Sequence, residues 1–514
     1  MELDRDLLAI QEVRNAVRLA RKAQETLATL NQEQVDRIVN SMQQAGYHYA
    51  AHLAKMAVEE TGMGVFEDKV FKNQFASRYV YESIKNQKTV GFIRENKEKA
   101  IWEIAEPVGV IAAIVPTTNP TSTVIYKSLI SLKARNAIVF SPHPSAVNCT
   151  LEAARLMNEA AMRVGAPEGV VTCLAHPSLG ATHELMHHPD ISLILATGGS
   201  SLVKAAYSAG KPAIGVGPGN VPAFVERSAD LREAAKNIVA GKTFDNGTIC
   251  ASEQSIVTER VIAEELIGYL KSEGCYFLER EEIQKVSEVV MLPTGGVNPK
   301  VVGRSPQVIA DMAGINIPPG TRVLVAELAG VGPRYPLSLE KLSTVLAFYR
   351  VEDWHQGCER CLELLRAGGV GHSLAIHSQN EEIIKEFALK KPIFRILVNT
   401  ASTFGAIGAT TGLPPALTLS CGTWGGSSTS DNVTPWHLLN IKRVARPIQT
   451  ISRDTSFQEQ KTKEVGLGGP VPSVSADFQP SPPNPVASSA QSVSEDLIEL
   501  IVAQVIRSLK PEKV

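Results

Sequence analysis

The sequence lacks the features of a membrane protein or a nucleic-acid-binding protein. Its 514 residues contain no apolar run long enough to span a bilayer. The N-terminal stretch MELDRDLLAIQEVRNAVRLARKAQ is charged throughout and has no apolar segment of the kind that signal peptides need. The formal net charge is only −2, which gives no electrostatic basis for binding nucleic acid. These absences predict a cytoplasmic globular protein with no membrane and no nucleic-acid partner.

Cysteine is also scarce. The seven cysteines are an odd number in a chain large enough to build a core without cross-links, so reduced thiols are expected. Cys358 and Cys361 form a CxxC, but they lie in WHQGCERCLELLRAGG, which has a helical pattern. Because no second pair and no histidine cluster accompanies them, two helical thiols one turn apart are favoured over a redox or metal site, and no metal is expected.

The chain does contain a long alternation of short apolar strands and amphipathic helices. Residues 5–60 have helical spacing, and from Ile101 the strand candidates are IWEIAE, VGVIAAIVP, AIVFSP, VVTCLA, ISLILAT and VPAFVE. A second block, from about residue 240 to 430, has the strand candidates QSIVTE, RVLVAE, TVLAFYRV, SLAIHS and RILVNT. The pattern predicts an α/β fold with two domains, each a mostly parallel sheet covered by helices on both faces.

The composition changes after about residue 450. Residues 451–492 are rich in Pro, Ser and Gly, which predicts a flexible linker, and residues 493–510 then show one apolar stripe of an amphipathic helix. A short helix on such a tether resembles the encapsulation peptides of bacterial microcompartment enzymes, which bind a shell protein. Two alternatives are less favoured: the long tether argues against docking on the chain itself, and the few basic residues argue against a membrane surface.

One segment suggests nucleophilic chemistry. In KTFDNGTICASEQS (242–255), Cys250 follows a small, polar turn and precedes a strand, so a substrate can reach it, and nearby helix N-termini would favour its thiolate. NIVAGKTFDNGTICASEQSIV closely resembles the nucleophile segment of CoA-acylating aldehyde dehydrogenases. Over residues 5–445 the resemblance recurs in order at IVPTTNPTSTVIYKSL, APEGVV, ATGGSSLV, GVGPGNVPAFV, NPKVVGRSPQVIADMAGI, EKLSTVLA, GHSLAIHS and CGTWGGSS.

The resemblance implies the aldehyde dehydrogenase fold and a domain plan. Residues 1–240 would form the NAD-binding domain, with oligomerisation strands near 100–106, and residues 241–428 the catalytic domain. Residues 429–450 would return to the oligomerisation element. Members of the family form dimers or tetramers, so a homodimer or homotetramer is expected, with IWEIAE and residues 436–446 as candidate joining strands.

The resemblance also implies a reaction. The thiolate of Cys250 would add to the aldehyde carbonyl, and Asn119, in PTTNP, would stabilise the oxyanion together with the backbone N–H of Cys250. Many hydrolytic relatives have PWNxP here, with the asparagine one place earlier, where this chain has Thr118. The simpler alternative is that Asn119 only shapes a turn before Pro120. Hydride transfer to the nicotinamide would leave a thioester on Cys250.

The fate of that thioester distinguishes two enzyme classes. Hydrolytic relatives carry a glutamate base in a segment reading E-L-G-G, whereas this chain has glycine at the glutamate position of Gly215-Val216-Gly217-Pro218. Without the base, coenzyme A rather than water would take the acyl group. The expected products are propionyl-CoA or acetyl-CoA, from propanal or acetaldehyde, inside a microcompartment. The alternatives are a hydrolytic enzyme that yields a free acid and an inactive scaffold.

The cofactor site is predicted from the same resemblance. In ILATGGSSLVKAAY the glycine turn and helix N-terminus would bind a pyrophosphate, and Glu340 would hold the nicotinamide ribose unless it only caps a helix. Where relatives carry an adenosine-binding lysine, this chain has Ser141 and His143, which favours NAD over NADP. Coenzyme A would use an overlapping pocket in turn. His372 is interpreted as a structural polar residue rather than a catalyst. The loop 421–428 is a candidate lining of the aldehyde pocket, and the alternative is that its glycines only form tight turns. The complete set of predicted cofactor residues is Thr117, Thr118, Ser141, His143, Gly198, Gly199, Ser200, Gly217 and Glu340.

Overall fold

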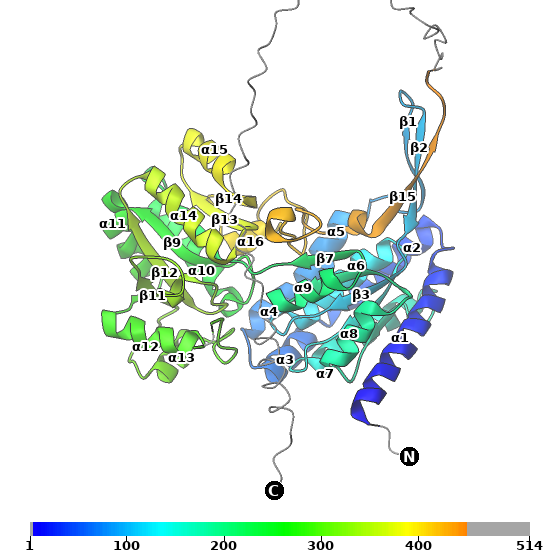
Figure 1. The fold of residues 1–514 in the computed structure, drawn as a ribbon, viewed down its shortest axis with the longest axis horizontal. Coiled ribbons are helices and arrows are strands. Elements are labelled where there is room, and N and C mark those ends of the chain that lie inside the picture. Colours follow the sequence, from blue (N-terminus) through cyan, green and yellow to red (C-terminus); the bar gives the residue numbers. More distant parts are fainter. Residues whose placement is uncertain (1–3, 294, 450–514) are drawn as a thin grey trace, which may run out of the picture. The chain divides into compact units, whose positions relative to one another are not determined.

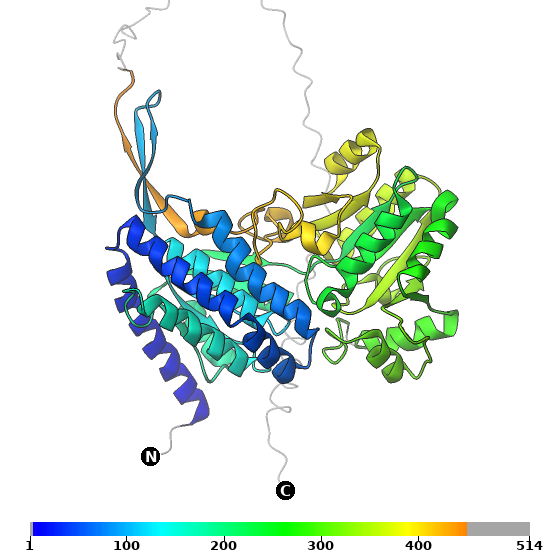
Figure 2. The ribbon, with the colours of Figure 1, turned by 180° about the vertical axis from the view of Figure 1, so that it is seen from behind.

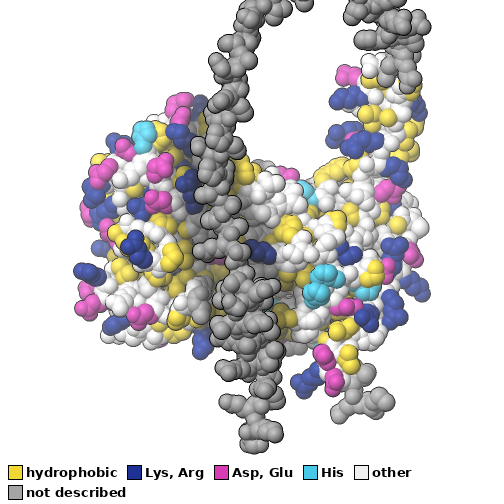
Figure 3. Space-filling model, in the orientation of Figure 1, with side chains coloured by type: hydrophobic (Ala, Val, Ile, Leu, Met, Phe, Trp, Pro, Cys, Tyr) yellow, Lys and Arg dark blue, Asp and Glu magenta, His cyan; other side chains and the backbone are white. Residues whose placement is uncertain are grey.

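The computed structural model describes residues 4–293 and 295–449. The predicted linker 451–492 and the predicted helix 493–510 therefore lie outside the described residues. Within the described ranges, no helix is both long enough and apolar enough to cross a bilayer. Figure 3 shows Lys and Arg side chains interspersed with Asp and Glu on the face that it draws.

The N-terminal half forms a five-stranded parallel sheet with the strand order β5-β4-β3-β6-β7. Its strands are β3 (Val110–Ile114), β4 (Ala137–Ser141), β5 (Val171–Cys173), β6 (Ile191–Thr197) and β7 (Ala213–Val216). Alternate residues of β3 enter two separate apolar clusters, because successive side chains of a strand point to opposite faces. Every residue of β3 and β4 is buried, as expected of a parallel sheet that is covered on both sides.

Helices cover both faces of this sheet (Figures 1 and 2). One cluster joins the sheet to α2 (Gln32–His48), α6 (Pro120–Lys133) and α7 (Val147–Met162). The other joins it to α1 (Arg5–Leu27), α8 (Leu179–His187) and α9 (Ser200–Ser208). The remaining N-terminal helices are α3 (Ala50–Thr61), α4 (Phe66–Gln74), a π-helical turn (Phe75–Tyr79) and α5 (Val80–Ile84).

The second half forms a seven-stranded parallel sheet with the order β10-β11-β12-β9-β8-β13-β14. The strands are β8 (Val221–Val225), β9 (Glu253–Glu259), β10 (Cys275–Phe277), β11 (Val323–Glu327), β12 (Val345–Val351), β13 (Gly371–His377) and β14 (Ile393–Val398). The helices are α10 (Leu231–Thr243), α11 (Arg260–Ser272), α12 (Arg280–Val290), α13 (Pro306–Ala313), α14 (Trp354–Gly368), α15 (Glu381–Lys390) and α16 (Ser402–Ala406). The α/β fold with parallel sheets is thus confirmed.

The boundary between the two sheets differs from the predicted position after residue 240. β8 is hydrogen-bonded to β9 and β13 of the seven-stranded sheet, and α10 packs in the same apolar cluster. The chain therefore crosses between the sheets in residues 217–220. The sequence does not mark this crossing, since β7 (AIGV) and β8 (VPAFV) are both short apolar strands.

A third, antiparallel sheet joins β1 (Gly91–Asn96), β2 (Ile101–Pro107) and β15 (Leu439–Ala445). It extends from the five-stranded sheet as a narrow arm (Figure 1). β2 and β15 coincide with the two segments proposed as joining strands. β1 was not predicted, because it has only two apolar side chains, Phe92 and Ile93, next to each other, and none of its residues is buried.

Candidate active site

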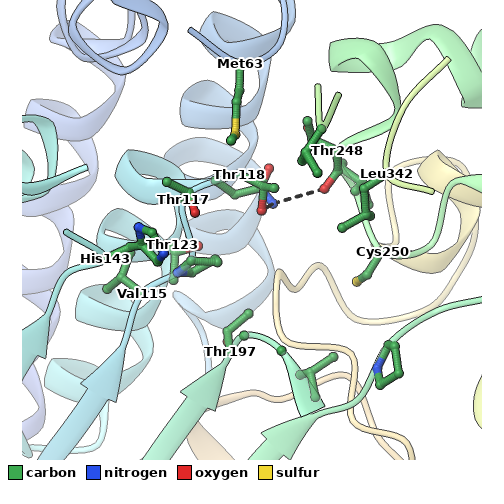
Figure 4. Close-up of a pocket in the computed structure, with 18 of the residues that line it drawn as sticks. Met63, Val115, Thr117, Thr118, Thr123, His143, Thr197, Thr248, Cys250 and Leu342 are labelled. Carbon is green, nitrogen blue, oxygen red and sulfur yellow. Dashed lines mark hydrogen bonds between the residues drawn. The ribbon is translucent and has the colours of Figure 1, made fainter. Parts of the chain in front are cut away.

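A cavity of about 530 Å³ opens at the carboxyl ends of β3, β6 and β7. This edge of a parallel sheet is where α/β proteins commonly bind ligands. The cavity brings together most of the predicted site residues from both halves of the chain, and Figure 4 shows Thr117, Thr118 and His143 facing Thr248, Leu342 and Cys250 across it. The predicted residues that line it are Thr117, Thr118, Asn119, His143, Gly198, Gly199, Gly217, Cys250 and Glu340.

One predicted cofactor residue, Ser141, is placed differently. Ser141 is buried at the end of β4, where its hydroxyl shares a 3.0 Å hydrogen bond with Thr182 Oγ1, and it is not among the lining residues. Ser200 begins α9 next to the two lining glycines. The side chain of Ser141 therefore braces the sheet, while its neighbour His143 reaches the cavity.

Cys250 is held by a loop of unusual backbone conformation. Asp245, Asn246 and Gly247 have φ angles of 49°, 54° and 74°, which glycine adopts readily but other residues rarely do. Asp245 Oδ1 accepts the backbone N–H of Val65 at 2.8 Å, which holds the loop against the chain before α4. The strained turn redirects the chain after α10, so that Cys250 faces the cavity before β9 begins.

The thiol of Cys250 is not poised as a thiolate in the free protein, contrary to the expectation from nearby helix N-termini. Burial raises its pKa to about 12, and the charges of Glu340 and Cys421 act in the same direction. Arg395 and the backbone N–H of Cys250 itself oppose the shift. The thiol therefore needs a change in its surroundings, such as ligand binding, before it ionises near neutral pH.

Asn119 presents its amide nitrogen to the nucleophile loop. Its Nδ2 donates to Thr118 Oγ1 at 3.0 Å and, at 3.5 Å, to the carbonyl of Thr248 (the dashed line in Figure 4). Its Oδ1 accepts a hydrogen bond from Lys72 on α4. Although Asn119 is the N-cap of α6, its side chain makes no capping bond, and its Nδ2 points to Thr118 and Thr248, which both line the cavity.

The position of the missing glutamate base is closed. A Cβ on Gly215 would lie 2.6 Å from Val203 Cγ1 and 3.0 Å from the Tyr207 ring of α9. Its backbone is also occupied, since the N–H donates to Tyr207 and the carbonyl accepts from Ser420 and Ser427. No side chain fits at residue 215 without displacing the side chains of Val203 and Tyr207 on α9.

Glu340 is the one acidic residue that lines the cavity in the described ranges. Burial raises its pKa to about 7, although the N–H of Gly219, which donates to Oε1 at 2.9 Å, favours the charged form. Gly219 has to be glycine, because a Cβ there would lie 1.9 Å from the carbonyl oxygen of Cys250. This close approach brings Glu340, through Gly219, beside the nucleophile.

The other side of the cavity fits a dinucleotide phosphate. Gly198 and Gly199 line it just before α9, and a Cβ on Gly199 would meet no atom within 4 Å. Backbone N–H groups at an open helix N-terminus suit a pyrophosphate. His143, whose pKa burial lowers, adds a neutral polar side chain. No Lys or Arg lines the cavity within residues 4–293 and 295–449.

His372 and the loop 421–428 lie behind this wall. His372 is buried on β13 and its Nδ1 pairs with Ser373 Oγ at 3.1 Å, while its Nε2 has no partner among the described residues. Burial and the charge of Arg395 lower its pKa to about 3, so the ring is neutral. The loop approaches Gly217 from outside and its Trp424 stacks on Phe394, so it does not line the cavity.

Sequence reasoning missed Lys69 and Lys72, which lie on α4 and contact the nucleophile loop. Their side chains are only 3% exposed. In the sequence FEDKVFKNQ, two lysines are typical of the solvent-exposed face of a helix. The one feature that points to a shared role is their spacing of three residues, which puts both on one face.

Comparison with known proteins agrees with this geometry. The chain is 45% identical, over 442 residues, to the bifunctional aldehyde-alcohol dehydrogenase AdhE of Escherichia coli K12, covering 85% of this chain and 50% of that protein. The chain thus spans about half the length of the first curated relatives that it matches. It is 38% identical to the succinate-semialdehyde dehydrogenase (acetylating) of Clostridium kluyveri, covering 84% of this chain and 95% of that protein.

Solved structures show the same fold. An acetylating aldehyde dehydrogenase from Geobacillus thermoglucosidasius superposes with a TM-score of 0.87 at 53% identity, covering 88% of this chain and all of that chain. A propionaldehyde dehydrogenase from the fucose utilisation microcompartment of Clostridium phytofermentans has a TM-score of 0.77 at 30% identity, covering 84% and 97%. Further neighbours contain bound propionyl-CoA or NADP+.

The model of the aldehyde dehydrogenase family matches residues 7–273, which include Asn119 and Cys250. The match spans the whole five-stranded sheet and the nucleophile loop. The chain belongs to the aldehyde dehydrogenase family.

Proposed function

We propose that the chain is an acylating aldehyde dehydrogenase that oxidises a short-chain aldehyde with NAD at Cys250 and transfers the acyl group to coenzyme A. The observation that carries the proposal is the closed position at Gly215, next to a cavity in which a cysteine faces a glycine-rich helix N-terminus. Relatives and neighbours named as acetylating or acylating enzymes support it.

The first half of the reaction forms a thioester on Cys250. The sulfur adds to the aldehyde carbon, and the resulting oxyanion receives hydrogen bonds from Asn119 Nδ2 and the backbone N–H of Cys250. Departure of the hydride restores the C=O bond and leaves the acyl group on sulfur. A bound nicotinamide supplies the hydride acceptor.

The second half depends on which nucleophile reaches the thioester. Gly215 provides no carboxylate, and Oε1 of Glu340 already accepts the N–H of Gly219. Water that lacks a general base attacks slowly, whereas a thiolate needs no such help. The sulfur of coenzyme A therefore takes the acyl group and Cys250 departs as the thiolate.

The cofactor assignment follows from the lining residues. Gly198, Gly199 and the start of α9 would hold the pyrophosphate, and Glu340 would hold the nicotinamide ribose. No cation among the described lining residues is available for a 2′-phosphate, which favours NAD over NADP. Coenzyme A would occupy the same cavity after the dinucleotide leaves, in a ping-pong order. Comparing kcat/KM for the two dinucleotides tests the preference.

The substrate and the location are further parts of the proposal. Propanal and acetaldehyde are the proposed substrates, and the neighbour from a microcompartment supports a similar setting. Residues 493–510 would bind a shell protein, and the arm formed by β1, β2 and β15 would join a homodimer or homotetramer. Deletion of residues 493–514 is expected to preserve turnover and abolish co-localisation with shells; co-localisation of the truncated chain would contradict the targeting role.

The decisive assay measures NADH from propanal with and without coenzyme A, and identifies the product. We expect turnover that requires coenzyme A and yields propionyl-CoA. Rapid formation of propionate without coenzyme A would instead support a hydrolytic enzyme. Cys250→Ala is the control, since NADH formation unchanged by that substitution would remove Cys250 from the reaction and favour a scaffold.

A further inference from the structure

Two lysines and one aspartate form a buried charged cluster behind Asn119. Lys69 and Lys72 come from α4 and Asp245 from the nucleophile loop, and their side chains are 3%, 3% and 0% exposed. Burying three charges is unfavourable unless each is closely paired. None of the three lines the cavity in the part of the chain that the structure describes, so the cluster does not contact a ligand directly.

Lys72 uses its ammonium group on three acceptors at once. It donates to Asn119 Oδ1, to Asp245 Oδ2 and, at 2.8 Å, to Thr248 Oγ1. An ammonium group has three donors and no acceptor, so all of its hydrogen-bonding capacity is used. Its contact with Asn119 can be made only by the amide oxygen, never by the amide nitrogen.

The contact from Lys72 therefore selects one of the two orientations of the Asn119 amide. With Oδ1 turned toward Lys72, Nδ2 must face Thr118 Oγ1 and the Thr248 carbonyl, which lie on the cavity side. In the opposite orientation the amide N–H groups would meet an ammonium group, and the oxygen would face the developing oxyanion. Both contacts would be repulsive.

Asp245 fixes Lys72 in turn. Its Oδ2 accepts from Lys69 at 3.0 Å and from Thr248 Oγ1 at 2.6 Å, as well as from Lys72. Burial raises the pKa of Asp245, but the charges of Lys72 and Lys69 outweigh that effect and hold the pKa below its usual range. The ionised carboxylate thus ties the loop of Cys250 to the helix that orients Asn119.

We propose that Lys72 is a positioning residue that sets the amide of Asn119 as the oxyanion donor beside Cys250. The inference rests on the proposed function, because it gives Asn119 a role in the reaction. An oxyanion donor acts mainly in the transition state, and loss of one typically lowers kcat by about 10²- to 10³-fold. Lys72→Met is expected to lower kcat by about 10²-fold, with little change in the KM for the aldehyde.

A double-mutant cycle separates this role from a merely structural one. If Lys72 acts through Asn119, then Lys72→Met combined with Asn119→Ala lowers kcat no further than Asn119→Ala alone. Lys69→Met is the matched control, since it removes an equally buried lysine bound to the same Asp245 without touching the Asn119 side chain. Its effect is expected to add to that of Asn119→Ala. Additive losses for Lys72→Met, or equal behaviour of the two lysines, would overturn the proposal.

Crystal structures of the full-length protein and of Lys72→Met provide a readout that does not need turnover. We expect the Asn119 amide to leave Thr118 Oγ1 in the variant, and an unchanged amide would overturn the inference. Asp245 keeps Lys69 and Thr248 as partners, so the variant should fold, and Lys72→Arg, which retains donors, should recover part of the lost rate. Absence of coenzyme-A-dependent turnover in the unsubstituted protein would contradict the proposed function but leave this structural test intact.

Discussion

Introducing a carboxylate at Gly217 is expected to convert the acylating reaction partly into hydrolysis. Gly217 lines the same cavity as Cys250, and its backbone does not require a positive φ. A Cβ there would lie 3.6 Å from the Gly425 carbonyl oxygen and 4.0 Å from Cys421 Sγ, both ordinary contacts. Unlike Gly215, this position accepts a Cβ without displacing its neighbours.

The expected size follows from general-base catalysis, which contributes about 10²- to 10⁴-fold. A carboxylate that is not held by designed contacts should reach the lower end, so Gly217→Glu is expected to accelerate CoA-independent deacylation by about 10²-fold. That factor corresponds to about 2.7 kcal/mol of barrier at 25 °C. The added negative charge also opposes ionisation of Cys250, so the first half-reaction should slow at the same time.

A burst experiment separates the two effects. Enzyme is mixed with propanal and NAD without coenzyme A, the NADH burst reports acylation, and the later steady rate of propionate formation reports hydrolysis. Gly217→Gln is the matched control, because it has the same shape without a base. A glutamate variant that hydrolyses the thioester no faster than the glutamine variant would refute the view that a missing carboxylate is what preserves the thioester.

Three further outcomes are expected. Gly215→Ala should overpack against Val203 and lower the urea midpoint of unfolding by the equivalent of about 1–3 kcal/mol. Gly268→Ala is the control, because the new Cβ in α11 would have no atom within 4 Å, and it should be neutral or stabilising. Equal effects of the two substitutions would contradict the closed position at residue 215. Alkylation of Cys250 by iodoacetamide in the free enzyme should rise about tenfold per pH unit from pH 7 to 9, because a pKa of about 12 leaves the thiolate a small fraction throughout, and a plateau below pH 9 would show that the thiol is less shielded. Glu340→Gln should raise the KM for NAD more than it changes the ratio of acyl transfer to hydrolysis; a large fall in hydrolysis would instead identify Glu340 as a base.

The sequence was most informative where apolar runs are continuous. The buried strands β3, β4 and β6 were predicted, since parallel strands covered on both faces leave an unbroken apolar signal. β1 escaped because an exposed arm has no such signal. The assignment of β8 to the second sheet depends on pairing with β9 and with β13, about 150 residues later, and no local pattern encodes these pairings.

The site was predictable only as far as its motifs. Cys250, Asn119 and the glycines before α9 lie in segments with a recognisable pattern, and the structure places them on one cavity. Lys72 lies 47 residues before its partner Asn119 and 173 before Asp245. Lys72 looks solvent-exposed in the sequence, and only the packing of α4 against the nucleophile loop buries it and makes it a hydrogen-bond donor to the Asn119 side chain.

The crossing between the two sheets also forms part of the reaction chamber. Gly217 and Pro218 line the cavity, and Gly219 contacts both Glu340 and the carbonyl of Cys250, all within the residues that connect β7 to β8. This connector links the two sheets and also positions the groups of the active site, so it cannot move without changing the site. A movement of one sheet relative to the other during ligand exchange would therefore shift Cys250 and Glu340 at the same time. Opening of the cavity and loss of the reactive geometry would then occur together.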